Sequence, residues 1–421
     1  MKDYSVRDIP MKINKENIKH LEENYGKNIL PLSIFDNENF PGINPLEILL
    51  FYKKETSVSK LKESLLKTIE HYNLFSSCLI MIDDNKFALQ YCTDGAVVNV
   101  LPSINAKFDD INIDDIKKMM IHVKTLPGEP LFAVTGIPME DGILGAISCS
   151  HAIGDGISLM LFLYAWNCII EGKSLLPPSG QRLFKGSPTD FDKIDKVFIT
   201  PLSELNDIVQ NRVKNVSNTK IYTTREYFSD EFLNEMKNQA KSENAKYIIS
   251  NNQIMTSFLL KKYHDYILPN TDRIVLKSPI NLREIHPDID SMYIGSANFN
   301  SFTEFTKDEI NNMSIYQIAY RIKESMVNMR NEKYANEIVQ LSQYGIEINV
   351  DIFRKNRPPY SVDTNIVSSN LTHLNDIESL FLGPSTGSIL YIGLAVETGF
   401  TILKEKSGSI FAQITSRYPL M

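Results

Sequence analysis

The sequence predicts a mixed α/β protein whose chain divides into two halves of similar size. Segments with helical periodicity alternate with short apolar segments of strand character, but without the regular spacing of βαβ units. The chain has 421 residues, of which 43% are apolar and 23% charged, so it holds enough apolar material for more than one core. A stretch with weak periodicity that contains Pro177-Pro178-Ser179-Gly180 interrupts this pattern. We therefore expect mixed sheets in an N-terminal half (1–175) and a C-terminal half (221–421), joined by a crossover linker (176–220).

Three segments show the periodicity of amphipathic helices. In each, apolar residues recur every three or four positions, which places their side chains on one face of a helix. Ser229 precedes the second segment and is a candidate N-cap, because its hydroxyl can accept a hydrogen bond from a free backbone N–H of the first turn. The predicted helices cover residues 57–72, 229–240 and 315–329.

Eight short, largely apolar segments are predicted to be strands. Helices and strands follow one another in both halves of the chain, so we expect helices that pack on sheets in each half. The predicted strands cover residues 47–52, 75–82, 87–92, 131–138, 143–150, 274–279, 388–395 and 409–414.

The charge and cysteine content argue against several classes of protein. The net charge is −7 and the sequence pI is about 5.6, with no basic run, which argues against a nucleic-acid-binding protein. The four cysteines form neither a CxxC pair nor a disulfide ladder, so we expect small buried thiols in a reducing compartment. The N-terminus has no apolar signal segment, and no apolar run reaches the ~18–20 residues that cross a bilayer. We therefore expect a cytoplasmic protein without a membrane span.

The stretch with the most chemical content is His151-Ala152-Ile153-Gly154-Asp155-Gly156. It follows the predicted apolar strand at 143–150 and precedes an apolar helix that Gly172 closes. Gly154 and Gly156 allow the backbone to take a positive φ or to approach another group closely. A histidine and a carboxylate between two apolar elements must both have polar partners if they are buried.

The residues alone leave the role of this stretch open. His151 can act as a general base, because neutral imidazole takes a proton near pH 7. Asp155 can then orient the ring, or hold the loop through a distant cation. Equally, His151 can be a satisfied histidine in a strand-to-helix turn, with Asp155 as the cap of the helix. A metal site is disfavoured because no third ligand accompanies the two residues, and a serine nucleophile is disfavoured because no GxSxG turn is present.

The hexapeptide at 151–156 resembles the HxxxDG signature of the coenzyme A-dependent acyltransferase superfamily. This superfamily includes chloramphenicol acetyltransferase, the BAHD acyltransferases, alcohol acetyltransferases and the condensation domains of nonribosomal peptide synthetases. Other stretches resemble BAHD-type segments and occur in the same order, among them the opening strand at 31–36 and the NLR…P…YxGN segment. The similar stretches are residues 31–36, 61–65, 72–74, 130–132, Trp166, 281–283, 286–287 and 293–295.

Three departures narrow the resemblance within the superfamily. Ser150 stands where condensation domains usually have a first histidine, which favours the stand-alone acyltransferases. The DFGWG segment of BAHD enzymes is absent, and Val367-Ser368-Ser369-Asn370-Leu371 instead resembles the Ser-Asn-Leu strand of alcohol acetyltransferases. Third, the chain has no phosphate-cradling glycine loop, so coenzyme A is implied by the resemblance alone, and an acyl-phosphopantetheine arm would fit the same channel. The match to the YxGN segment is itself partial, because Ser296 replaces its closing asparagine.

The resemblance implies a fold and an activity. The fold would be two chloramphenicol-acetyltransferase-like halves with an active-site channel between them and His151 in mid-channel as the general base. Acyl-CoA, or an acyl-phosphopantetheine arm, would be a co-substrate, with no permanently bound cofactor and no metal. The acceptor would be a hydroxyl or amine of a small molecule, with an acyl carrier protein as a possible partner.

The resemblance also assigns supporting residues. Asp155 and Gly156 would hold the motif, with Arg283 as the ion-pair partner of Asp155. Ser369, Asn370 and Asn281 are candidates for contacts with the oxyanion or the channel, and the alternative for Ser369 and Asn370 is that they only end a strand beside a loop. His373 lies close to Ser369 and Asn370 in sequence. One alternative is a condensation-like domain acting on carrier-bound substrates. The other is a non-catalytic binding protein of the same shape, and the intact HxxxDG motif argues against this second alternative.

Overall fold

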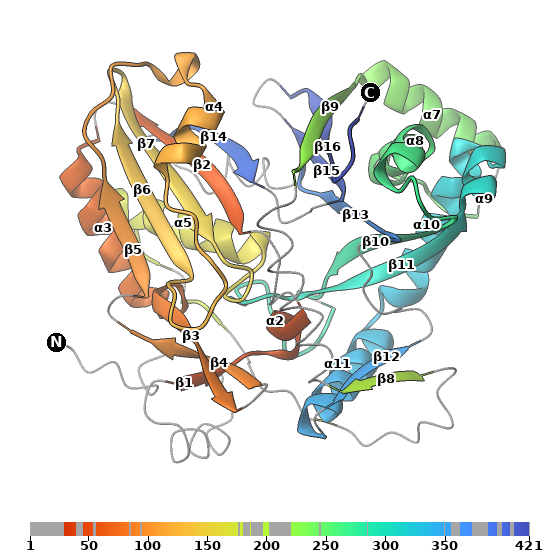
Figure 1. The fold of residues 1–421 in the computed structure, drawn as a ribbon, viewed down its shortest axis with the longest axis horizontal. Coiled ribbons are helices and arrows are strands. Elements are labelled where there is room, and N and C mark those ends of the chain that lie inside the picture. The colour runs from red at the N-terminus through yellow and green to blue at the C-terminus, as the bar shows by residue number, and fades with distance from the viewer. Residues whose placement is uncertain are drawn as a thin grey trace.

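A computed structural model of the chain describes most of its length, and Figure 1 shows the two halves side by side. N-terminal elements form one half, and most of the C-terminal elements form the other. None of the described helices is long and apolar enough to cross a membrane. The described residues are 29–38, 45–53, 56–83, 86–92, 95–175, 177–179, 186, 197–201, 220–243, 246–283, 285–348, 350–354, 363–372, 386–393, 398–404 and 408–420.

The N-terminal half is built on a five-stranded sheet of order β14-β2-β7-β6-β5. Helices α3 and α5 contact one another, and their apolar side chains share one large core with one face of this sheet. In β2, Ile48 and Leu50 point into this core, whereas Leu49 between them points into a smaller core on the opposite face of the sheet. This is the alternation expected of successive residues in a strand. A separate small sheet has the order β1-β4-β3. The elements of this half are β1 (Ile29–Pro31), α2 (Ile34–Glu38), β2 (Leu46–Lys53), α3 (Val58–His71), η2 (Asn73–Ser76), β3 (Ser77–Asp83), β4 (Lys86–Tyr91), β5 (Ala96–Val100), η3 (Phe108–Asp110), α4 (Ile113–Met119), β6 (Phe132–Pro138), β7 (Gly142–Cys149) and α5 (Gly156–Ile170).

The C-terminal half is built on a six-stranded sheet of order β11-β10-β13-β15-β16-β9. Its two central pairs, β10 with β13 and β13 with β15, are parallel, and the other pairs are antiparallel. Helices α7, α8 and α10 cover one face and bury a second large core against it (Figure 1). The elements are β8 (Val197–Pro201), β9 (Tyr222–Phe228), α7 (Asp230–Glu243), α8 (Asn251–Ile267), β10 (Arg273–Asn281), β11 (Asn298–Thr306), α9 (Lys307–Asn312), α10 (Ile315–Met329), α11 (Glu332–Glu347), β12 (Val350–Arg354), β13 (Asn365–Asn370), β14 (Thr386–Gly393), β15 (Gly399–Lys404) and β16 (Ile410–Ser416).

The halves exchange two elements. Strand β14 comes from the C-terminal part of the chain but pairs antiparallel with β2 at the edge of the N-terminal sheet. Helix α2 makes the opposite crossing, because its Ile34 and Phe35 pack in a core with residues of β10, β11 and α11. Figure 1 shows α2 between the halves and β14 beside β2. The two halves are therefore joined by secondary structure as well as by the chain.

The mixed α/β architecture is confirmed, as are the three predicted helices, which the structure places in α3, α7 and α10. The predicted strands occur as β2, β3, β4, β6, β7, β10, β14 and β16, with ends shifted by up to two residues. The strand predicted at 31–36 is wrong beyond Pro31. Ser33 and Asp36 there bond each other's backbone N–H, at 3.1 and 2.9 Å, and this reciprocal cap starts helix α2. Most of the predicted linker lies outside the described residues, and the proposed domain boundaries remain a prediction.

Candidate active site

The predicted catalytic stretch forms a turn between the most buried strand of the N-terminal sheet and an apolar helix. We call residues 150–155 the motif loop. All eight residues of β7 before it are buried, and α5 follows it. Asp155 is the N-cap of α5, because its Oδ1 accepts a hydrogen bond of 2.9 Å from the backbone N of Ser158. The helix ends at Ile170, and the φ of 70° at Gly172 allows the bonds from Gly172 N to the carbonyl of Ile169 and from Lys173 N to the carbonyl of Cys168 that form a Schellman motif.

Gly154 is required by a close approach and not by its backbone angle. Gly154 does not have a positive φ, but a Cβ at this position would lie only 2.7 Å from the Cβ of Ser158. The loop therefore packs directly on the first turn of α5. Any side chain at 154 would displace the turn that carries His151.

Asp155 forms a buried ion pair with Arg283, 128 residues later in the chain. Arg283 Nη1 lies 2.8 Å from Asp155 Oδ2, and Nη2 lies 3.0 Å from Oδ1, which is the bidentate geometry of a strong pair. The two side chains are 3% and 8% exposed. Ala297 N donates a further bond of 3.0 Å to Oδ2. The carboxylate thus holds the motif loop against the C-terminal half, and its hydrogen bonds go to these groups and to Ser158.

The environment fixes Asp155 in its ionised form. Burial alone would raise the pKa of its carboxyl, but the charge of Arg283 and the hydrogen bonds from Arg283, Ser158 and Ala297 outweigh burial and hold the pKa below its ordinary value. At neutral pH Asp155 is therefore a carboxylate, and its hydrogen bonds from Arg283, Ser158 and Ala297 all stabilise that form.

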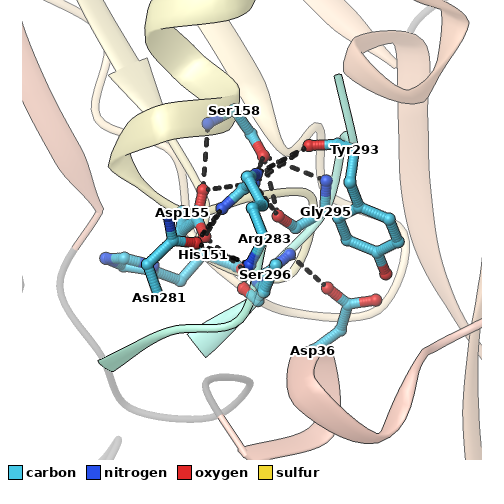
Figure 2. A network of polar contacts seen from close by, with 10 residues as sticks. Asp36, His151, Asp155, Ser158, Asn281, Arg283, Tyr293, Gly295 and Ser296 are labelled. Atoms are coloured by element: carbon cyan, nitrogen blue, oxygen red, sulfur yellow. Dashed lines mark hydrogen bonds and ion pairs between the residues drawn. The ribbon is translucent and has the colours of Figure 1, made fainter. Parts of the chain in front are cut away.

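Arg283 has more partners than Asp155. Its guanidinium also donates to the carbonyl oxygens of Tyr293 and Gly295 and to Ser158 Oγ, at 2.9 to 3.2 Å (Figure 2). Asn281, at the end of β10, accepts from both the backbone N and Nη1 of Arg283 through Oδ1. Asn281 therefore orients Arg283, and this oxygen is committed to the ion-pair network.

Three consecutive residues of the C-terminal half contact the motif loop and the first turn of α5. The backbone N and O of Gly295 both bond Ser158 Oγ, at 3.0 and 2.7 Å. Ser296 Oγ donates to the backbone carbonyl of His151 at 3.2 Å, and Ala297 N donates to Asp155. Ser296 N in turn donates to Asp36 Oδ1 at 3.0 Å. Figure 2 shows these contacts meeting around Arg283.

The ring of His151 lies beside this network and points away from it (Figure 2). Its Nδ1 is buried and has no hydrogen-bond partner within the part of the chain that the structure describes, although the residue as a whole is only partly buried. Burial lowers the pKa of His151 to about 4, and the charge of Asp155 opposes this shift only in part. The imidazole is therefore neutral at pH 7, the form that can accept a proton.

The proposed oxyanion residues lie on a different element from His151. Ser369 and Asn370 are the last residues of β13, and both are partly buried. Asn370 Oδ1 accepts from the backbone N and the hydroxyl of Thr372, at 2.9 and 2.8 Å, which fixes its amide. Leu371 directly after it packs against the large core of the N-terminal half, so this end of β13 reaches the other half. His373 and His20 lie outside the described residues.

Several network residues were not predicted from the sequence. Ser158, Ser296 and Asp36 connect the loop to the C-terminal half, and only Ser158 carried a signal, as a polar residue one turn into an otherwise apolar helix. Trp166 is buried in α5 and donates its indole N–H to Ser64 of α3 at 2.9 Å, which fixes the two helices to each other. Within the described residues, no group of three or more His, Cys, Asp or Glu side chains could hold a metal ion.

A model of the Transferase family matches residues 11–374 of the chain. No curated protein sequence matches significantly. Among solved structures, TRI101 of F. sporotrichioides complexed with coenzyme A and T-2 is 14% identical, with a TM-score of 0.68 over 92% of this chain and 95% of that one. Vinorine synthase is 14% identical, with a TM-score of 0.61 over 92% and 91%. The starter condensation domain of rhizomide synthetase RzmA is 11% identical, with a TM-score of 0.56 over 93% and 89%. These likenesses establish the fold.

Proposed function

We propose, from the premise that this chain belongs to the Transferase family, that it moves an acyl group from a thioester to the hydroxyl or amine of a small molecule. Family membership confirms the acyltransferase that the HxxxDG resemblance predicted. The donor, the acceptor and the roles of individual residues are our inference. The observation that carries it is the neutral His151 held beside a complete Asp155–Arg283 network.

His151 acts as the general base in this proposal. The neutral imidazole takes the proton of the acceptor O–H or N–H as the acceptor atom attacks the thioester carbonyl carbon. The C–S bond then breaks, and the imidazolium gives its proton to the departing thiolate. The products are the ester or amide and the free thiol, so the proton count balances without a covalent enzyme intermediate. The negative charge of Asp155 nearby favours the transient imidazolium.

The oxyanion of the tetrahedral intermediate needs a hydrogen-bond donor. We assign this role to Ser369 and Asn370 as candidates, because Oδ1 of Asn370 is taken by Thr372, which leaves its amide N–H groups to serve as donors. Preorganised hydrogen-bond donors that stabilise the oxyanion often make the largest single contribution to catalysis.

Coenzyme A is the donor carrier that we propose for the thioester. The support is indirect: the TRI101 structure of the same fold is complexed with coenzyme A. Ser150 in place of a first histidine also favours a stand-alone enzyme over a carrier-dependent condensation domain. An acyl carrier protein remains a donor to compare by experiment.

Thiol release tests the proposal. The protein is incubated with a panel of acyl-CoAs and acyl-carrier thioesters and with pooled alcohol and amine acceptors. Acceptor-dependent release should fall by ~10²–10⁴-fold in His151→Ala, the size expected for a lost general base. His71→Ala, an exposed residue at the end of α3, is the control and should keep wild-type activity. Release that is absent in the wild type or unchanged in His151→Ala would favour a non-catalytic binding protein.

A further inference from the structure

Two buried serines bond the same peptide unit, the one that follows His151. Ser296 Oγ donates to its carbonyl oxygen, and Ala152 N of the same unit donates to Ser150 Oγ at 3.2 Å. Both serines have no exposed surface. The two hydroxyls come from opposite halves of the molecule, since Ser150 follows β7 and Ser296 precedes β11.

Each serine is itself held in place. Ser150 Oγ is also hydrogen-bonded to the hydroxyl of Thr125 at 2.7 Å, and Ser150 N donates to the carbonyl of Leu131 at 2.8 Å. Ser296 is anchored by its backbone N, which donates to the fully buried Asp36 of α2. Ser150 is the first residue of the motif loop, but Thr125 and Leu131 outside the loop hold it, and Ser296 is held by Asp36.

The peptide plane after a residue decides where its side chain points. A plane bonded at both its C=O and its N–H cannot rotate without losing both bonds, so ψ of His151 is restrained. This restraint limits the direction of the Cα–Cβ bond, from which the side-chain torsions place the imidazole. The Asp155–Arg283 pair acts at the other end of the loop, four residues later, where the Asp155 carboxylate accepts hydrogen bonds from Arg283, Ser158 and Ala297.

We propose that Ser150 and Ser296 are positioning residues that clamp the His151–Ala152 peptide unit from both halves and thereby aim the imidazole at the reacting proton. This inference rests on the proposed function of His151. It gives a physical role to Ser150 and Ser296, two of the positions at which this chain departs from the family pattern.

The test uses Ser150→Ala, Ser296→Ala and the double variant. Each single change should lower kcat by roughly tenfold, and the double by roughly 100-fold, the scale of a 1 Å misplacement of a reacting group. KM for the acyl donor should stay within about twofold, because the substituted groups are buried. Ser296→Thr keeps a hydroxyl and should recover most of kcat if it folds.

Ser301→Ala is the matched control. Ser301 has no exposed surface, and its Oγ donates to the backbone carbonyl of Ser278 at 3.2 Å, the same bond as Ser296 makes to His151. Its removal should lower the melting temperature as much as Ser296→Ala does while kcat stays at the wild-type value. Equal kcat values in Ser150→Ala, Ser296→Ala and Ser301→Ala would overturn the clamp.

A readout independent of turnover separates the clamp from the proposed function. The ring ¹⁵N signals of the seven histidines can be recorded by NMR, with His151→Ala used to assign the signal of His151. In Ser150→Ala and Ser296→Ala the His151 signal should shift or broaden, and in Ser301→Ala it should not. If thiol release does not depend on His151, the proposed function fails, and the NMR spectrum still tests the clamp. If Ser150→Ala and Ser296→Ala change neither the His151 signal nor kcat, the clamp alone is refuted.

Discussion

At the scale of single residues, the protonation of His151 follows from its burial. The ring nitrogen Nδ1 has no contact with solvent, and the charged ring would lose hydration that Asp155 replaces only in part. A histidine in this setting stays neutral well below the pH at which exposed histidines take up a proton. This protects the basic form over a wide pH range, although it makes the base intrinsically weaker.

We expect the pH dependence of kcat/KM to show this shift. If the free enzyme needs neutral His151, its acid limb should have a midpoint near pH 4, where the pKa of His151 lies, and activity should be nearly constant between pH 6 and 8. Thiol release measured across this range with a stable acyl donor checks the expectation. A midpoint near 6.5 would mean that the ring titrates as if exposed.

The same shift makes stability depend on pH. The pKa of His151 is lower in the folded state than in the unfolded chain, so between about pH 6.5 and 4 the unfolded chain binds more protons, and stability falls as pH falls. The contribution lost at pH 5 is about 2 kcal/mol. Urea unfolding at pH 7 and pH 5 measures it, and His151→Gln should remove this part of the difference.

The Asp155–Arg283 pair predicts a large stability change. Removing one partner leaves a buried charge without compensation, so Arg283→Ala should lower the free energy of unfolding by ~3–5 kcal/mol. Arg273→Ala, which removes an exposed pair with Glu304, is the control and should cost ~1 kcal/mol or less. Chemical denaturation of both variants checks the comparison. Equal losses would show that the buried pair is not what holds the loop.

How far the sequence predicts this site depends on the range of the contacts. The motif and the apolar elements around it are local, so His151 and Asp155 stood out on spacing alone. Arg283 was paired with Asp155 only through the family resemblance, because nothing in its own neighbourhood marks a residue 128 positions away. Ser296 stood out only as a departure from the YxGN segment, and its contacts and those of Asp36 could not be predicted, since they depend on backbone atoms that the sequence does not place.

At the scale of elements, periodicity predicted the amphipathic helices α3, α7 and α10 but missed α11. Helix α8 was missed because buried residues are spread around it and no single polar face appears. Strands β9, β11 and β15 were missed, whereas β13 was expected through the family resemblance. The resemblance also placed a strand at 31–36, where the structure forms α2. The reciprocal cap of Ser33 and Asp36 decided for the helix.

Strand β14 offers a test at this scale. Ile389 and Leu390 lie opposite Leu50 and Leu49 of β2, and successive residues of a strand direct their N–H groups to opposite edges. Ile389→Pro and Leu390→Pro should therefore differ in their effect on the pairing with β2, because only one of the two replaced N–H groups donates a hydrogen bond to β2. Hydrogen exchange in β2 should rise in that variant, with β16 unchanged. Full protection of β2 in both variants would contradict the pairing.

At the scale of the whole molecule, the two halves are interdependent. Each sheet has its own core, yet α2 packs in a core of the C-terminal half and β14 completes the N-terminal sheet. The proposed catalytic loop lies on the N-terminal half, but residues 295–297 of the other half bond the loop and the first turn of α5. A mutation in either half can therefore disturb His151 without touching it.

The crossing of β14 also has a consequence for the order in which the protein is made. Residues 46–53 leave the ribosome early, whereas their edge partner at 386–393 is synthesised more than 300 residues later, by the numbering of the paired strands. Until then β2 is an unpaired edge strand of the nascent N-terminal sheet, and unpaired edge strands can pair with strands of other chains. The first sheet therefore cannot be completed until residues 386–393 have been made and have reached β2.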